Sequence, residues 1–176
     1  MFLRISKKGM TLPEAILSLA VFVLVIESCM VMTKVGWDSW ATNSTRVEVI
    51  GELRQAMARV GNELRSSGTA EITDVPADGN WYHAITFKTT LEPAAGAAVW
   101  SSDIQYALGG EEGIVLNRTQ DGLVRPTAQL IEEFSVRRLA AAPQTVELRI
   151  KTSKRTGRAN EVLAFTGDMQ IALRNQ

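Results

Sequence analysis

The apolar positions near the start of the chain form an almost continuous run from Leu12 to Met32. An α-helix over these residues would rise roughly 31 Å, which is enough to cross the hydrocarbon core of a bilayer. The preceding residues 1–9 contain Arg4, Lys7 and Lys8 and no acidic residue. Because basic residues beside a membrane span tend to stay in the cytoplasm, we expect a cytoplasmic N-terminus and an extracytoplasmic remainder.

Beyond this run, hydrophobic residues recur at spacings of mostly three and four residues. That period predicts an amphipathic helix with one apolar stripe. Together the two segments predict one helix from about Pro13 to Ser66, roughly 80 Å long, with Gly68 as its C-terminal cap. The stripe consists of Trp37, Trp40, Val47, Ile50, Leu53, Met57, Val60 and Leu64.

The rest of the chain shows the alternation and the turn signals of β-strands. Gly109 and Gly110 lie between two such strands and predict a hairpin. The pattern as a whole predicts an α+β fold, with the long N-terminal helix packed on an antiparallel β-sheet domain. Strands are expected at 81–89, 102–108, 113–120, 131–139, 145–152 and 161–175, the last bent near Gly167, with loops at 69–80 and 90–101 and a polar, basic turn at 151–160.

Composition argues against several kinds of chemistry. The chain has 19 basic and 19 acidic residues, so it lacks the excess positive charge that indicates nucleic-acid binding. Its only cysteine is Cys29 and its only histidine is His83, so neither an intramolecular disulfide nor a cysteine-based zinc site can form. The sequence has no P-loop, dinucleotide-binding glycines or G-x-S-x-G motif. We therefore expect no enzymatic activity, metal ion or cofactor.

The remaining polar candidates have simple structural interpretations. His83 alternates along a predicted strand and is expected to be structural or exposed. Acidic residues near turns lack the one-three-five spacing of a calcium loop, and a group of basic residues is expected at an exposed hairpin tip. The acidic residues are Asp103, Glu111, Glu112 and Asp121, and the basic ones are Lys151, Lys154, Arg155 and Arg158.

Three interpretations compete for the N-terminal segment. A cleaved secretory signal needs a small-x-small site, and "VIESCMVM" provides a poor one. An ordinary single-pass anchor explains the apolar run but leaves Glu14 as an unexplained cost of roughly 2–3 kcal/mol at depth in the bilayer. Glu27, toward the outer end of the span, either snorkels outward or pairs within an assembly, and the sequence does not decide between these.

The third interpretation accounts for Glu14. The stretch "KKGMTLPEA" resembles the class III signal of type IV pilins and type II secretion pseudopilins. That signal has a short basic leader, a Gly, a cleavage point, a hydrophobic first mature residue and a Glu at the fifth mature position. Cleavage after Gly9 would make Met10 the first mature residue, and Glu14 is then the fifth. Met10 departs from the usual Phe, although its side chain is also large and apolar.

The resemblance implies a processing and assembly pathway. A prepilin peptidase would cut after Gly9 and methylate the new amine of Met10. Glu14 of one subunit would pair with the N-terminal amine of a neighbour, which makes a buried carboxylate tolerable and fixes the axial register. The implied division is a leader at 1–9, a transmembrane and assembly helix at 10–36, its amphipathic continuation at 37–66 and a soluble β-sheet domain at 67–176.

The resemblance also implies the partners and the place of action. The order "DIQYAL", "GIVLNRT", "IEEFSVRRL", "VELRIKT" looks like the J-type minor pseudopilin and its pilus counterpart, the W-type minor pilin. Such a subunit would enter the bacterial inner membrane and then the tip region of a secretion pseudopilus, a pilus or a DNA-uptake filament. Its partners would be the prepilin peptidase, other major and minor pilins or pseudopilins, the inner-membrane assembly platform and membrane lipid. An uncleaved membrane-tethered binding domain is the alternative from a different class.

Overall fold

The computed structural model describes residues 10–94, 97–156 and 161–173. The predicted leader residues Arg4, Lys7, Lys8 and Gly9, and Arg158 of the predicted basic turn, lie outside these ranges. The chain divides into two compact units, Met1–Thr42 and Asn43–Gln176. The elements in chain order are α1 (Leu12–Arg65), the short 3-10 helix η1 (Thr69–Glu71), β1 (Ala84–Phe87), β2 (Thr90–Ala94), β3 (Ala97–Trp100), β4 (Ile104–Gly109), β5 (Val115–Gln120), β6 (Leu123–Ala128), β7 (Ile131–Leu139), β8 (Ala142–Arg155) and β9 (Val162–Ala172).

The predicted long helix is confirmed to within one residue at each end. Its last turn tightens, because the N–H of Ser66 donates to the carbonyl of Glu63 and that of Ser67 donates to the carbonyl of Leu64. The prediction for Gly68 is wrong, since its φ of −90° and ψ of 156° are extended rather than left-handed. A side chain at Gly68 would instead collide with the indole of Trp100, which lies 2.7 Å from the position of a Cβ atom.

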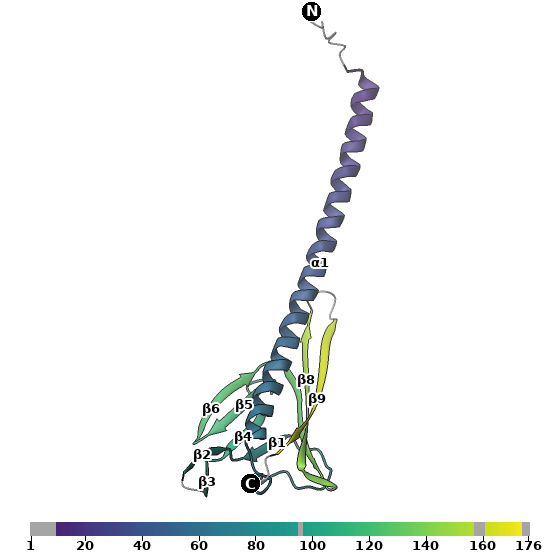
Figure 1. Ribbon diagram of the computed structural model, residues 1–176. Coiled ribbons are helices and arrows are strands. Elements are labelled where there is room, and N and C mark those ends of the chain that lie inside the picture. The colour runs from purple at the N-terminus through teal and green to yellow at the C-terminus, as the bar shows by residue number, and fades with distance from the viewer. Residues whose placement is uncertain (1–9, 95–96, 157–160, 174–176) are drawn as a thin grey trace, which may run out of the picture. The chain divides into compact units, whose positions relative to one another are not determined.

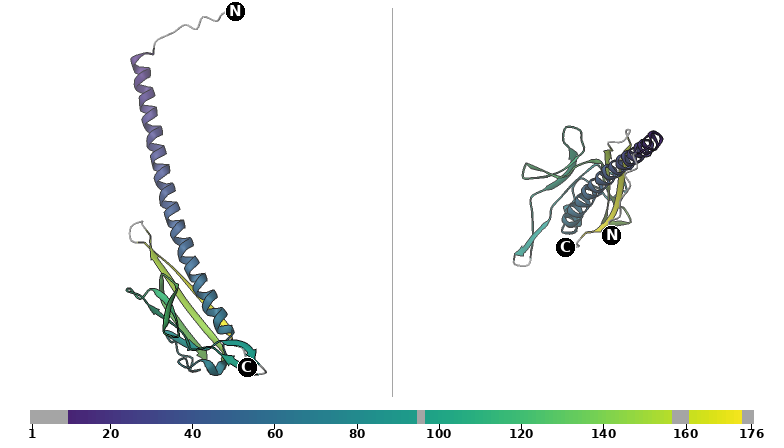
Figure 2. Two further views of the ribbon diagram at one scale, coloured as in Figure 1. Left: turned by 90° about the vertical axis from the view of Figure 1, so that its left-hand side faces the viewer. Right: turned by 90° about the horizontal axis from the view of Figure 1, so that it is seen from above.

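The described residues of the second unit form three antiparallel sheets rather than one (Figure 1). Strands β1, β4, β5 and β6 form a four-stranded sheet in the order β1-β4-β5-β6, and β2 pairs with β3 alone. The third sheet has the order β7-β8-β9, and all residues of β9 pair in register with β8. Residues 43–65 of α1 lie between the four-stranded sheet on one side and β8 and β9 on the other, as Figures 1 and 2 both show.

Several predicted strands are confirmed and others are corrected. The β4–β5 hairpin, β7 and β9 occur where the alternation and the turn residues place them. The prediction of a loop at 90–101 is wrong, because β2 and β3 form a hairpin there, and β6 was not predicted. Both β2 and β6 contain a proline, which breaks the usual strand pattern but is tolerated at a sheet edge. The predicted turn at 151–160 begins later, since β8 continues to Arg155.

The buried stripe of the helix differs from the predicted one. Val47 is 72% exposed and Trp37 and Trp40 are each 65% exposed, so these three do not belong to the core. Val49 and Ala56 are fully buried in their place, which restores the 3.6-residue period with Leu53, Val60 and Leu64. These helix residues from Leu53 onward share one hydrophobic core with residues of the four-stranded sheet and of β7, β8 and β9, among them Phe87, Tyr106, Phe134, Leu148 and Ile150.

Arg138 is the one arginine that is buried among the described residues, with 8% of its surface exposed. Its guanidinium donates to three backbone carbonyls, from Nε to Pro143 at 3.1 Å, from Nη1 to Val75 at 3.2 Å and from Nη2 to Thr69 at 3.2 Å. Burial lowers the pKa of Arg138 from its ordinary value, because desolvation disfavours the charged form. The side chain thus ties the segment after α1 to the β7–β8 turn.

Replacing Arg138 by Met should lower the free energy of unfolding by about 2–4 kcal/mol, because one buried and two partly buried hydrogen bonds lose their donor at once. Urea unfolding of residues 43–176 within the full chain, followed by tryptophan fluorescence, measures this change. Arg125→Met is the matched control, since Arg125 is exposed on β6 and its loss should change stability by no more than about 0.5 kcal/mol. Equal effects of the two substitutions would contradict the structural role of Arg138.

Candidate functional site

The candidate site begins at the first turn of α1, where Glu14 lies. The N–H and the hydroxyl of Thr11 each donate to Oε2 of Glu14 at 2.9 Å, and the N–H of Ala15 donates to the carbonyl of Thr11 at 3.1 Å. Thr11 therefore occupies the N-cap position and Glu14 the N3 position, which is the spacing of a capping box. Pro13 lies between them, in the first turn, where a helix has no partner for its N–H. One oxygen of Glu14, Oε1, accepts no hydrogen bond from any described residue.

The helix that follows presents an unbroken apolar surface. Among its described residues the span is 0% buried, and α1 is long and apolar enough to cross a membrane. Exposed fractions along it include 78% for Leu12, 61% for Phe22 and 68% for Met30. Apolar surface of this extent on a soluble protein marks contact with a membrane or with another protein.

The polar residues inside this span are mostly satisfied by the helix itself. The hydroxyl of Ser28 donates to the carbonyl of Leu24 and that of Thr33 to the carbonyl of Cys29, both at 2.8 Å. Such back-bonding lets hydroxyl groups enter hydrocarbon without unsatisfied donors. Glu27 is exposed and has no hydrogen bond or ion pair with any described residue. Of the acidic groups on this surface it is therefore the one without a partner among the residues that the structure describes.

Trp37 and Trp40 follow the span within the first unit. Their rings meet edge to face, with centroids 5.9 Å apart and an interplanar angle of 88°. Both are exposed, so they suit an aromatic belt at a membrane interface better than the stripe that packs on the sheets.

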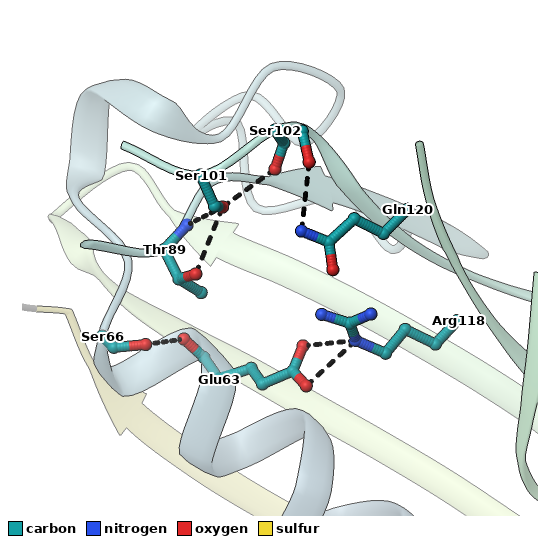
Figure 3. A network of polar contacts seen from close by, with 7 residues as sticks. All are labelled: Glu63, Ser66, Thr89, Ser101, Ser102, Arg118 and Gln120. Carbon is teal, nitrogen blue, oxygen red and sulfur yellow. Dashed lines mark hydrogen bonds and ion pairs between the residues drawn. The ribbon is translucent and has the colours of Figure 1, made fainter. Parts of the chain in front are cut away.

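A second polar cluster joins α1 to the four-stranded sheet (Figure 3). Nε of Arg118, on β5, donates to both carboxylate oxygens of Glu63, at 3.0 and 2.9 Å, and the two side chains point at each other in Figure 3. The Arg118 side chain is 14% exposed and that of Glu63 is 24% exposed. Because removal of either partner would leave a mostly desolvated charge, this pair fixes which face of the helix meets β5.

Tyr106, on β4, lies near this ion pair and is fully buried. Its hydroxyl has no hydrogen-bond partner among the described residues. Burial, and then the nearby Glu63 carboxylate, raise the pKa of Tyr106 well above its ordinary value. The cluster therefore contains a phenol that stays neutral near neutral pH.

The outer face of the β7-β8-β9 sheet carries a ladder of charges around Trp81. The guanidinium groups of Arg137 and Arg149 lie 4.4 and 4.7 Å from the centroid of the Trp81 ring. Each arginine also pairs with a carboxylate, Arg137 with Glu147 and Arg149 with Asp168. A shallow depression is lined by these five residues with Leu148, Met169 and Gln170. Its charges are matched in pairs, so it has no net preference for an ion of either sign.

The other predicted polar residues do not converge on a site. His83 is exposed, and its Nδ1 lies 3.4 Å from the carbonyl oxygen of Phe134. Asp103 lies near Lys88, while Lys151 and Lys154 pair with Glu132 and Glu48. Within the part of the chain that the structure describes, no group of three or more His, Cys, Asp or Glu residues is placed to hold a metal ion.

Comparisons of the chain with protein families, with curated proteins and with solved structures gave no match. The geometry of the described residues is therefore the ground for a functional proposal.

Sequence reasoning identified Glu14 but not the role of Thr11. The signal was present, because a Thr three residues before a Glu at the start of an apolar run is the pattern of a capping box. The Glu63–Arg118 pair and the Arg138 contacts were also missed. Glu63 and Arg118 are 55 residues apart, and Val75 and Thr69 lie 63 and 69 residues from Arg138, so no local pattern indicates these contacts.

The raised pKa of Tyr106 predicts a loss of stability at alkaline pH. The folded state holds the phenol proton more tightly than the unfolded chain, whose tyrosine pKa is about 10. The resulting stability is therefore present below pH 10 and is lost as the pH rises toward the folded pKa, by about 1 kcal/mol between pH 8 and pH 11. Urea unfolding at the two pH values measures this loss.

Tyr106→Phe supplies the control for this prediction. It removes a buried hydroxyl without a partner, so stability at pH 8 should be unchanged or slightly higher. The alkaline loss should shrink but not vanish, because Tyr82, whose hydroxyl donates to Asp78, also has a raised pKa. An identical alkaline loss in Tyr106→Phe and the unaltered protein would show that Tyr106 does not titrate as proposed.

Proposed function

We propose that this chain is a non-enzymatic assembly subunit of the type IV pilin and pseudopilin kind. The observation that carries the proposal is the position of Glu14, five residues after Gly9 and in the first turn of an exposed apolar helix. A plain membrane anchor needs no carboxylate there, whereas a subunit that packs helix against helix can use one to fix its register. The α+β layout, with a long N-terminal helix packed on antiparallel sheets, supports the same proposal.

The hydrogen bonds of Glu14 suggest how one carboxylate serves two purposes. Thr11 occupies Oε2 and holds the side chain against the start of the helix. Oε1 remains available to accept a hydrogen bond from the positively charged amine that cleavage after Gly9 would create on Met10 of a neighbouring subunit. A carboxylate held in place by its own helix loses less side-chain entropy when it binds that amine.

The proposed subunit would act near the tip of a type II secretion pseudopilus, where it would initiate assembly and support protein secretion. It would be inserted in the inner membrane with residues 43–176 on the extracytoplasmic side. Minor pilins of a type IV pilus or of a DNA-uptake system use the same assembly chemistry and are the alternative within this class. The genes beside this one would separate them, because a secretin with secretion components and a retraction ATPase with pilus components mark different systems.

Processing is the first test of the proposal. Intact-mass and N-terminal peptide measurements on the chain purified from its own membranes should show a terminus at Met10 that carries one methyl group. Gly9→Ala should abolish most of this processing and leave residues 1–9 attached. An intact Met1 in the unaltered chain, or a cut elsewhere, would favour the uncleaved membrane-tethered binding domain instead.

The role of Glu14 is tested by a pair of substitutions. Glu14→Gln keeps an acceptor for the Thr11 N–H, as a capping box allows, but it removes the charge. Glu14→Ala removes both. If charge pairing with a neighbour governs assembly, both variants should be processed normally and should lower incorporation into filaments by roughly tenfold or more, as expected for an interaction of 1.4 kcal/mol or above.

Incorporation is measured as the fraction of this subunit in sheared or detergent-extracted filaments. Thr11→Val is the matched control, because it removes one hydrogen bond to Glu14 and leaves the charge, so its loss of incorporation should be smaller. Normal incorporation of Glu14→Gln would mean that Glu14 serves only as a helix cap.

A further inference from the structure

The third sheet ends in a long strand whose outer edge is unpaired. The order β7-β8-β9 places β9 at the edge, and no described strand lies beyond it. The N–H of Thr156 donates to the carbonyl of Glu161, and the N–H of Leu173 donates to that of Gln144. Hydrogen-bonded pairs alternate in an antiparallel ladder, so the odd-numbered residues of β9 bond to β8. The N–H and C=O groups of the six even-numbered residues therefore face the free edge, from Val162, Ala164, Thr166, Asp168, Gln170 and Ala172.

This edge lacks the features that usually protect exposed strands. Such strands are commonly kept short or carry prolines, bulges or unpaired charges that prevent a further strand from pairing. The edge strand β6 has 6 residues, contains Pro126 and pairs with a register shift. By contrast, β9 has 11 residues, contains no proline and pairs with β8 without a shift. Its one charged residue, Asp168, is bound to Arg149 at 2.7 Å.

The direction of β9 relative to α1 bears on what can pair with it. Arg46 lies over the ring of Phe165, a Cβ on Gly167 would meet Met57 and Leu53, and a Cβ on Gly61 would meet Met169 and Ile171. Residue numbers thus rise together along the two elements, so β9 runs in the same direction as residues 43–65 of α1. These contacts also cover the inner face of β9 while leaving its edge free.

An added strand is expected to run antiparallel to β9, because every strand pair of the described sheets is antiparallel and parallel pairing is slightly less stable per residue. A second copy of the chain fits this edge poorly in that direction. Antiparallel pairing of two β9 edges would also make the two α1 segments antiparallel. The points where the helices continue toward the apolar span would then lie at opposite ends of segments roughly 35 Å long. Two chains anchored in one membrane cannot readily join in this way. This step rests on the proposed membrane anchoring.

We propose that the free edge of β9 binds an extended segment of a different polypeptide, which adds to the sheet as an antiparallel fourth strand next to β9. Main-chain hydrogen bonds to the six even-numbered residues supply the affinity, as in other cases of strand addition. On the inner face the added strand lies next to Leu163, Phe165 and Met169, so its side chains there are apolar or β-branched. On the outer face it lies next to Ala164, Thr166 and Gln170, which suits small or polar side chains.

Site-specific photocrosslinking in native membranes tests this inference. A photoreactive phenylalanine is placed at Ala164 or at Gln170 of the full-length chain, and at Val124 on β6 as an exposed control. Both β9 positions should give adducts with the same foreign polypeptide, about fivefold or more above the control, since the free edge of β9 is longer than that of β6 and lacks its proline and register shift. The cross-linked peptides should lie about six residues apart in the partner. Antiparallel pairing requires the site linked from 170 to precede the site linked from 164.

Proline substitution then tests the main-chain origin of the binding. Thr166→Pro removes an outward N–H without disturbing the ladder to β8, and it should reduce the adducts about fivefold or more. Thr166→Ser keeps that N–H and should leave them unchanged. Ala172→Pro, at the end of β9, is scored in place of Thr166→Pro if the latter lowers the resistance of the purified protein to proteolysis.

Several results would overturn the inference. These are adducts between two copies of this chain, adducts in parallel order, no adducts above the Val124 control, or adducts that a folded proline variant leaves intact. The outcome is independent of processing: a chain cleaved after Gly9 without β9 adducts refutes this inference alone. An uncleaved chain that forms the predicted adducts refutes the pilin proposal alone.

Discussion

The constraint on which the structure depends is that one continuous helix must satisfy two different solvents. From Leu12 to Val35 the large apolar side chains of α1 are exposed on every side, whereas Val49, Ala56 and Val60 further along are fully buried. Exposed apolar area of the first kind is stable only against lipid or other apolar helices. The second part needs one buried stripe and a polar remainder, because water reaches its other side. The sheets, the ion pairs and the chemistry of the first turn all follow from this division.

Polar groups on the helix are placed according to the same division. In the buried half, Glu63 meets Arg118 and Glu48 meets Lys154, so each of these two carboxylates has a cation supplied by a strand. The described residues of the first unit form no strand. There the hydroxyls bond back to the helix, and Thr11 holds Glu14 through hydrogen bonds, while no described residue supplies a counterion. A charge that is anchored in place but not neutralised by any described residue suits a contact between subunits better than a contact with lipid.

The sequence predicts those parts of the fold that depend on hydrophobic periodicity and on local turn residues. The bounds of α1, the β4–β5 hairpin and the position of β7 follow from hydrophobic periods and turn residues, and the position of Glu14 follows from counting. Hydrophobicity alone could not predict that Ala56 is buried and Val47 exposed. Ala56 is less hydrophobic than Val47, but it lies on the side of the helix that packs against the sheets. The strands β2 and β6 were hidden by their prolines. The strand at 145–152 was predicted, but its continuation to Arg155 in β8 was hidden by its basic residues. The buried contacts of Arg138 and Arg118 depend on segments brought together by the whole fold, for which single-sequence periodicity carries no signal.

Glu14 and the free edge of β9 would bind a partner through different interactions. Glu14 offers a single charge whose value depends on exclusion of water, so its contribution grows only once neighbouring helices have packed around it. The edge of β9 offers hydrogen bonds that are modest singly but add along a strand, and these form in water. Strand addition can therefore select a partner before the apolar helices pack, and the buried charge can then fix the register of the packed state. In the proposed function, a subunit that carries both features would separate recognition from assembly, as a component that starts a filament requires.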